Sequence, residues 1–222
     1  MFLYYITSRK EFAGEEKDRR RALRAKITEA ARAGVDYIQL REKDLSTRDL
    51  EALAQECVAQ LKKLRTENRE PRTRFLINSR TDIALAAGAD GVHLRSGDLQ
   101  PSELRCIWSS CSAGAPAREP LPIVAISCHS AADVVRAKSE GADCAVFAPV
   151  FEKKDAPQVQ PRGLAALREA CASAANFPVL ALGGVTIENA ASCIAAGASG
   201  IAGIRLFQEN KIEETVRALR AL

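Results

Sequence analysis

The stretch "AAGADGVHL", residues 86–94, has a pattern of residue types that occurs three more times along the chain. The related stretches are "ARAGVDYIQL" (31–40), "SEGADCAVF" (139–147) and "AAGASGIAG" (195–203). Each contains a glycine, a small or β-branched residue, an Asp or Ser, and then an apolar run. Because a left-handed backbone is cheap only for glycine, we expect each glycine to end a helix and each apolar run to begin a buried strand.

The spacing of the four stretches indicates further strands between them. Their glycines, Gly34, Gly88, Gly141 and Gly197, stand 54, 53 and 56 residues apart. A strand–helix unit takes about half of such an interval, so each stretch opens every second strand. With the apolar runs in between, eight strands are predicted, at residues 2–7, 35–41, 74–78, 90–94, 122–127, 143–148, 178–184 and 199–204.

Helical patterns separate these strands, at roughly 17–33, 47–65, 80–87, 101–108, 130–140, 162–174, 186–196 and 211–221. Ser130 and Thr186 are suited to N-terminal caps, and Pro101 to a first helical turn. Eight alternating strands and helices predict an α/β fold, a single-domain (β/α)8 TIM barrel spanning residues 1–222. An open, doubly wound sheet is the alternative. The segment 109–122 is expected to be a flexible loop.

Bulk composition is that of an ordinary globular protein. The 222 residues are 47% hydrophobic and 27% charged, with a formal net charge of +4, so nucleic-acid binding has no support beyond a basic helix face at 17–26. The seven cysteines form no Cys-x-x-Cys pair, which favours reduced, buried thiols. No run is long enough for a membrane span. We expect a cytoplasmic protein that does not bind membranes.

In TIM barrels the active site lies at the carboxyl ends of the strands, and polar residues follow each predicted strand. We expect the substrate-binding residues among these positions. The positions are Gln39, Arg41, Lys43, Asn78, Ser127 and Lys153. A cationic rim at the same face favours an anionic substrate; it contains Arg41, Lys43, Arg95, Lys153, Lys154 and Arg205.

Strands seven and eight end in a pattern suited to phosphate. Gly183 and Gly184 let backbone N–H groups approach a ligand, and the helix that follows favours an anion at its N-terminus. Gly203 and Arg205 are expected to complete this cradle after strand eight. The simpler interpretation is that Gly183 and Gly184 only form a tight turn.

The chain has two histidines, His93 inside the fourth strand and His129 just after the fifth. We expect His93 to lie in the core or to line the barrel. His129 is predicted at the catalytic face, where an imidazole can both take and give a proton near neutral pH. A purely structural loop histidine is the alternative for His129.

In this order, several segments resemble the thiamin phosphate synthase/TenI family over essentially the whole chain. They are "QLREKD", "INSRTDIALAAGADGVHL", "AISCHSAADV", "GADCAVFAPVF" and "LALGGVTIENAASCIAAGASGIAGI". The resemblance implies a TIM barrel that binds a thiazole phosphate. The synthases join a pyrimidine pyrophosphate to a thiazole phosphate using Mg²⁺, and TenI-type tautomerases aromatise a thiazole phosphate carboxylate by moving a proton.

The chain departs from the synthase pattern. Ser79 replaces the Mg²⁺-binding Asp that usually follows the asparagine, "RSGD" (95–98) keeps only Asp98, and Arg205 replaces a serine. "EKKDA" (152–156) stands where a Thr-x-Thr-Lys-like segment is usual, with Lys153 and Lys154 shifted in register. A site with one carboxylate holds Mg²⁺ more weakly.

The resemblance and these departures together favour a TenI-like thiazole tautomerase without a metal cofactor, in which His129 carries the proton. Arg41, Lys43 and Asn78 would bind the carboxylate or polarise the ring. The first alternative is a thiamin phosphate synthase with Mg²⁺ on Asp98, its lost contacts replaced by Lys153, Lys154 and Arg95. The second is a barrel that binds a phosphorylated ligand without turning it over. A homodimer through exposed barrel helices stays open.

Overall fold

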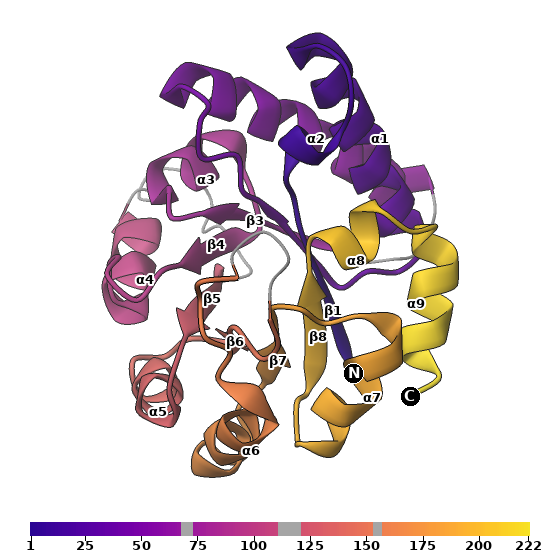
Figure 1. The fold of residues 1–222 in the computed structure, drawn as a ribbon. Helices are drawn as coiled ribbons and strands as arrows, with labels where there is room; N and C mark the ends of the chain where they lie inside the picture. The colour runs from indigo at the N-terminus through magenta and orange to yellow at the C-terminus, as the bar shows by residue number, and fades with distance from the viewer. Residues whose placement is uncertain (68–72, 111–120, 153–156) are drawn as a thin grey trace.

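The structure is a computed structural model that describes residues 1–67, 73–110, 121–152 and 157–222. In these residues eight parallel strands close into a barrel, each strand pairing with the next and β8 pairing with β1. Helices surround the barrel on its outside (Figure 1). The closed order confirms the expected (β/α)8 fold and excludes the open sheet.

The strands lie where the sequence predicts them; β3 and β5 have the expected length, and the other six are shorter by one to four residues. The ends of the shortened runs lead into the loops. The strands are β1 (Phe2–Ile6), β2 (Tyr37–Leu40), β3 (Arg74–Asn78), β4 (Gly91–Leu94), β5 (Ile123–Cys128), β6 (Cys144–Phe147), β7 (Val179–Ala181) and β8 (Gly200–Gly203).

The predicted helices are all present, with ends shifted by no more than two residues. They are α1 (Glu16–Arg32), α2 (Thr47–Glu67), α3 (Thr81–Ala87), α4 (Pro101–Ser110), α5 (Ala131–Ser139), α6 (Gly163–Ser173), α7 (Ile187–Ala195) and α9 (Ile212–Arg220). Two short elements were not predicted, η1 (Arg9–Glu11) and α8 (Arg205–Gln208). The loop expected at 109–122 begins later than predicted, because α4 continues through Ser110; residues 111–120 lie outside the described part.

The recurring stretch has a structural role for its acidic residue as well as for its glycine. Gly88 ends α3 in the left-handed region at φ 70°, and the other three glycines also have positive φ. The carboxylates of Asp36, Asp90 and Asp143 each accept the backbone N–H of a residue in the preceding strand, at 2.7–2.8 Å. Each also pairs with an arginine from a surrounding helix. Through these hydrogen bonds the acidic residue links neighbouring strands at the amino-terminal face of the barrel.

Side chains alternate between the inside of the barrel and the layer under the helices. The large outer core includes Leu3, Leu40, Ile77 and Phe147, and the smaller inner one includes Tyr4. The inner core occupies the middle of the barrel with Ile6, Leu76, Ala125, Val146, Leu180 and Ala202. Because residues along a strand alternate, the inward positions beyond this layer reach the carboxyl-terminal face.

The helices and cysteines around the barrel differ in how much of their surface is exposed. Helix α1 buries Leu23, Ile27 and Ala30, as expected. Of its basic residues at 17–26, however, only Lys17 and Arg21 are exposed, and the other four are partly buried, so the face is less solvated than predicted. Four of the six described cysteines are buried, but Cys106 is exposed on α4. None of the helices in the described ranges is both long and apolar enough to cross a membrane.

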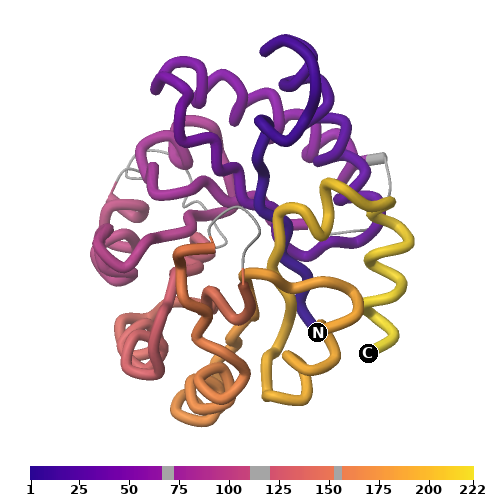
Figure 2. The backbone as a smooth tube through the Cα atoms, in the orientation of Figure 1, coloured from indigo at the N-terminus to yellow at the C-terminus, as the bar shows by residue number. Residues whose placement is uncertain are grey.

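The chain circles once around the barrel and brings its ends together, where Arg220 donates to the carbonyl of Met1 (Figure 2).

Candidate active site at the carboxyl ends of the strands

Gln39 and Asn78 meet inside the barrel at the ends of β2 and β3. The Gln39 Nε2 donates to the Asn78 Oδ1 at 2.8 Å. Gln39 is 1% exposed, and its Oε1 accepts no hydrogen bond from the residues that the structure describes. A buried acceptor without a donor is unfavourable, so this oxygen is suited to accept a hydrogen bond from a ligand.

Ser79 and Asp98 lie next to this pair. Ser79 has φ 61°, and its backbone N–H donates to the carbonyl of His93 at 2.8 Å. The Asn78 Nδ2 donates to the Ser79 Oγ at 3.2 Å. Burial raises the pKa of Asp98, but hydrogen bonds from Arg95 and Ser79 outweigh it and hold that pKa below its usual value. Asp98 is therefore an ionised carboxylate beside a serine hydroxyl.

His93 is buried inside the barrel, as the sequence predicts, and it links two other polar side chains. Its Nδ1 lies 2.8 Å from the Tyr4 hydroxyl and its Nε2 lies 2.8 Å from the Ser127 Oγ. Burial, with a smaller contribution from Arg41, lowers the pKa of His93 to about 3. The ring is therefore neutral, one nitrogen donating and the other accepting, and it holds Ser127 in place.

This low pKa predicts acid sensitivity. The unfolded chain binds a proton at this histidine below about pH 6.5, whereas the folded state does not, so the free energy of unfolding falls by about 1.4 kcal/mol per pH unit between pH 6.5 and 3. Between pH 7 and 5 the native chain should lose about 2 kcal/mol more than His93→Gln. Urea unfolding at both pH values measures the difference. Equal losses in the two proteins would show that His93 is not the group responsible.

His129 stands exposed immediately after β5. Its Nδ1 lies 2.7 Å from the carbonyl oxygen of Ala148, which can only accept, so Nδ1 carries the proton. In the neutral ring Nε2 is then unprotonated and able to take a proton. The next residue, Ser130, caps α5 by accepting the N–H of Asp133, as expected. The histidine is thus held in a defined tautomer at the mouth of the barrel.

The loops after β7 and β8 have the expected glycines. Gly183 and Gly184 have φ 97° and 66°, and Thr186 and Asn189 form a capping box at the start of α7. A Cβ on Gly184 would lie 2.3 Å from the carbonyl oxygen of Glu152, so this glycine is required by backbone packing. Gly203 ends β8, and Arg205, expected at a strand end, instead begins α8.

The rim residues differ in their surroundings. Arg41 is half-buried, and Lys43 is exposed at the same end of the barrel. Arg205 is half-buried and 4.0 Å from the Glu209 carboxylate. Arg95 donates to Asp98 and is mostly exposed. Lys153 and Lys154 lie outside the described residues, so their expected roles remain predictions.

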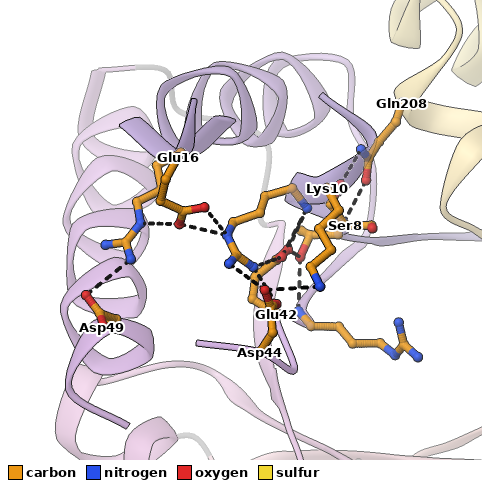
Figure 3. A network of polar contacts seen from close by, with 11 residues as sticks. Ser8, Lys10, Glu16, Glu42, Asp44, Asp49 and Gln208 are labelled. Atoms are coloured by element: carbon orange, nitrogen blue, oxygen red, sulfur yellow. Dashed lines mark hydrogen bonds and ion pairs between the residues drawn. The ribbon is translucent and has the colours of Figure 1, made fainter. Parts of the chain in front are cut away.

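Gln39 is thus hydrogen-bonded directly to Asn78, and Ser127 is hydrogen-bonded to the buried His93, which also contacts Tyr4. Two features were missed by sequence reasoning: the link through His93, and an ion cluster in which Arg9 pairs with Glu42, Asp44 and Glu16. Figure 3 shows the three carboxylates of this cluster. A charged residue three positions after the end of β1 was the available signal for Arg9. The described residues contain no group of three His, Cys, Asp or Glu arranged to hold a metal ion.

Polar side chains at the carboxyl ends of the strands are where TIM-barrel enzymes bind and transform substrates. Fold and site therefore define the class, a TIM-barrel protein with a candidate active site at its carboxyl-terminal face. A family model described as thiamine monophosphate synthase matches residues 3–207. The chain belongs to this family, as its motifs indicate.

Curated relatives and a solved structure agree with this assignment. A thiamine-phosphate synthase of Methanoculleus marisnigri is 40% identical over 193 residues, 86% of this chain and 83% of the relative. One from Chlorobium luteolum is 35% identical over 198 residues, 88% of this chain and 85% of the relative. The thiamine phosphate pyrophosphorylase of Pyrococcus furiosus has a TM-score of 0.75 at 27% identity, covering 99% of this chain and 94% of that one.

Proposed function

We propose that this chain is a thiamine-phosphate synthase, which joins a pyrimidine pyrophosphate to a thiazole phosphate and releases pyrophosphate. The names of the relatives support this transferase better than the tautomerase that the departures from the synthase pattern had favoured. The observation that carries the proposal is the hydrogen-bonded pair Gln39 and Asn78 close to Arg41, polar side chains suited to the edge of a heteroaromatic ring next to a cation.

In this proposal Gln39 and Asn78 bind the polar edge of the pyrimidine, with the Gln39 Oε1 accepting a hydrogen bond from it. Arg41 and Lys43 hold the pyrophosphate. The bond between the pyrimidine's methylene carbon and the pyrophosphate oxygen breaks, its electron pair leaves with pyrophosphate, and the thiazole nitrogen forms the new bond to that carbon. Cations placed where the leaving charge develops favour this step.

The thiazole phosphate would bind on the opposite side of the mouth. Backbone N–H groups at Gly183 and Gly184, the start of α7, and Arg205 with Gly203 form the proposed cradle. A hydroxyl at Ser127, fixed by His93, lies between the two halves and can donate to a phosphate oxygen.

The site fits Mg²⁺ with a small number of ligands from the chain. Asp98 is ionised and lies beside the Ser79 hydroxyl, so these two would hold Mg²⁺, with its other positions left to water and pyrophosphate oxygens. When bound, the ion would offset the charge of the pyrophosphate. Because Asp98 also pairs with Arg95, part of that charge compensation comes from the chain itself.

Asp98→Asn tests this part of the proposal. We expect the Mg²⁺ concentration for half-maximal coupling to rise about tenfold or more, since the one described carboxylate ligand is lost. Asp18→Asn, an exposed carboxylate on α1, should leave the Mg²⁺ dependence unchanged. A magnesium dependence that is the same in Asp98→Asn and the native chain would contradict a role for Asp98.

Thiazole tautomerisation is the second candidate, and the geometry of His129 favours it. An exposed imidazole with its unprotonated Nε2 at the mouth of the barrel is a suitable acid–base group. His129→Gln should abolish tautomerase activity if this is the function, whereas coupling, which needs no proton from this ring, should persist. Full tautomerase activity in His129→Gln would exclude the histidine as the proton carrier.

A further inference from the structure

An ion cluster built on the buried Arg9 and Glu42 follows the end of β2, and its outer carboxylates are exposed (Figure 3). Arg9, 4% exposed, donates from its backbone N–H and its Nη1 to the Glu42 carboxylate at 3.0–3.1 Å. The same guanidinium makes a two-pronged pair with Asp44 at 2.7 and 2.8 Å, and its Nε donates to Glu16 at 2.8 Å. We call Thr7, Arg9, Glu42 and Asp44 the Arg9 cluster.

The cluster uses every second residue of the segment "REKD" (41–44). Gln39 faces the barrel interior and Leu40 belongs to the outer core, so by alternation Arg41 faces the interior and Glu42 the outer layer. Glu42 is 4% exposed. The segment thus directs its anions toward Arg9 and its cation Arg41 toward the site.

Thr7 connects the cluster to the backbone of Arg41. Its hydroxyl donates to the Glu42 Oε1 at 2.6 Å and accepts the backbone N–H of Arg41 at 3.0 Å. Thr7 is fully buried. A shift of Glu42 would therefore move Thr7 and with it the peptide that carries Arg41.

The cluster also reaches the other half of the site. The backbone N–H of Ser8 donates to the Gln208 Oε1 at 2.8 Å, and the Gln208 Nε2 donates to the Ser8 carbonyl at 3.0 Å. Gln208 ends α8, the helix that Arg205 begins. One loop, residues 7–9, therefore contacts both elements that carry the proposed anion-binding cations.

We propose that Arg9 and Glu42 are positioning residues that hold Arg41 in the geometry needed to bind the pyrophosphate group. This inference rests on the proposed function, because it takes Arg41 as a pyrophosphate ligand. Neither residue touches the substrate; both act through the peptide between Leu40 and Glu42. Buried, charge-assisted hydrogen bonds fix a loop more strictly than exposed ones do.

Glu42→Gln separates positioning from simple electrostatics. Removing a negative charge near a cationic site should strengthen anion binding if charge alone mattered. The three groups that face Glu42, however, are all donors: the Thr7 hydroxyl, the Arg9 N–H and the Arg9 Nη1. A glutamine turns an NH₂ group toward one of them, which breaks the cluster. Positioning therefore predicts weaker anion binding from a change that removes negative charge.

Titration calorimetry with inorganic pyrophosphate and Mg²⁺, on the full chain, measures this effect. We expect the Kd to rise about tenfold or more in Glu42→Gln, and to change less than about twofold in Glu11→Gln, an exposed carboxylate in η1. If Glu42→Gln does not fold, Thr7→Val supplies the same test, and Thr7→Ser, which keeps the hydroxyl, should restore native affinity. In coupling assays the loss should appear in KM for the pyrimidine pyrophosphate.

The results separate this inference from the proposed function. Weaker binding in Arg41→Met together with unchanged or tighter binding in folded Glu42→Gln and Thr7→Val would overturn the positioning role alone. Binding that is insensitive to Arg41→Met would overturn both the ligand role of Arg41 and the inference. Weaker binding in all three, with a native Kd in Glu11→Gln, supports both.

Discussion

Replacing Arg41 with methionine is expected to lower kcat/KM for coupling by about 100-fold or more. Arg41 is the half-buried cation inside the barrel end, close enough to His93 to lower the pKa of that ring. Removing one preorganised group that stabilises developing negative charge typically costs about 10²–10³ in rate. Lys43, exposed at the rim, should contribute less, about tenfold, because solvent screens its charge.

Steady-state kinetics with both substrates measures the loss. Arg21→Met serves as the control, since Arg21 is exposed on α1 and pairs only with Asp18 among the contacts that the structure describes. An Arg41→Met protein with native kcat/KM would show that the pyrophosphate binds elsewhere, and the segment "KKDA" (153–156) would then be the next place to test.

Gly184→Ala is expected to lower the free energy of unfolding by about 3 kcal/mol or more. A left-handed backbone costs a non-glycine residue about 1–2 kcal/mol, and forcing atoms into a packed site adds about 1–3 kcal/mol. The new Cβ would lie 2.3 Å from the Glu152 carbonyl oxygen and 2.7 Å from the Phe151 Cβ, so the loop after β6 must move.

Gly34→Ala is a matched control for this variant. Gly34 also has positive φ, at 84°, but a Cβ there meets no atom within 4 Å, so its substitution should cost only the backbone strain, about 1–2 kcal/mol. Thermal and denaturant unfolding of the two variants gives both values. Equal destabilisation by Gly184→Ala and Gly34→Ala would contradict a close contact between Gly184 and the Glu152 carbonyl.

The barrel could be predicted because its signal is local and repeated. A glycine at a helix end and the apolar run after it can be recognised within ten residues. The interval between the four stretches then indicates the number of strands. The hydrogen-bonding role of the acidic residue in each stretch could not be predicted from the sequence. Asp36 accepts a hydrogen bond from Leu3, 33 positions earlier, and only the closed fold brings the two together.

The inner part of the site was predicted by position. Gln39, Asn78 and Ser127 were expected at strand ends, and the structure places them there. Their mutual contacts depend on the register between neighbouring strands, for which sequence spacing gives no rule. Asn78, for example, lies opposite His93 in the pairing of β3 with β4.

The supporting cluster was missed for a related reason. Arg9 and Glu42 are 33 positions apart, and charged residues are seldom buried, so both were natural candidates for solvent-exposed positions. Helix α8 was missed because four residues carry no helical periodicity. The choice between synthase and tautomerase came from the relatives, since the substitutions at Ser79 and in "RSGD" pointed the other way.

A direct coupling assay tests whether this chain is a thiamine-phosphate synthase. The purified chain is incubated with the pyrimidine pyrophosphate, the thiazole phosphate and Mg²⁺, and thiamin phosphate and pyrophosphate are measured together. We expect both products in equal amounts at an enzymatic rate, with thiamin phosphate absent when either substrate is withheld. A folded protein that binds the thiazole phosphate but forms no thiamin phosphate would contradict this assignment, and would leave a tautomerase or a binder without turnover.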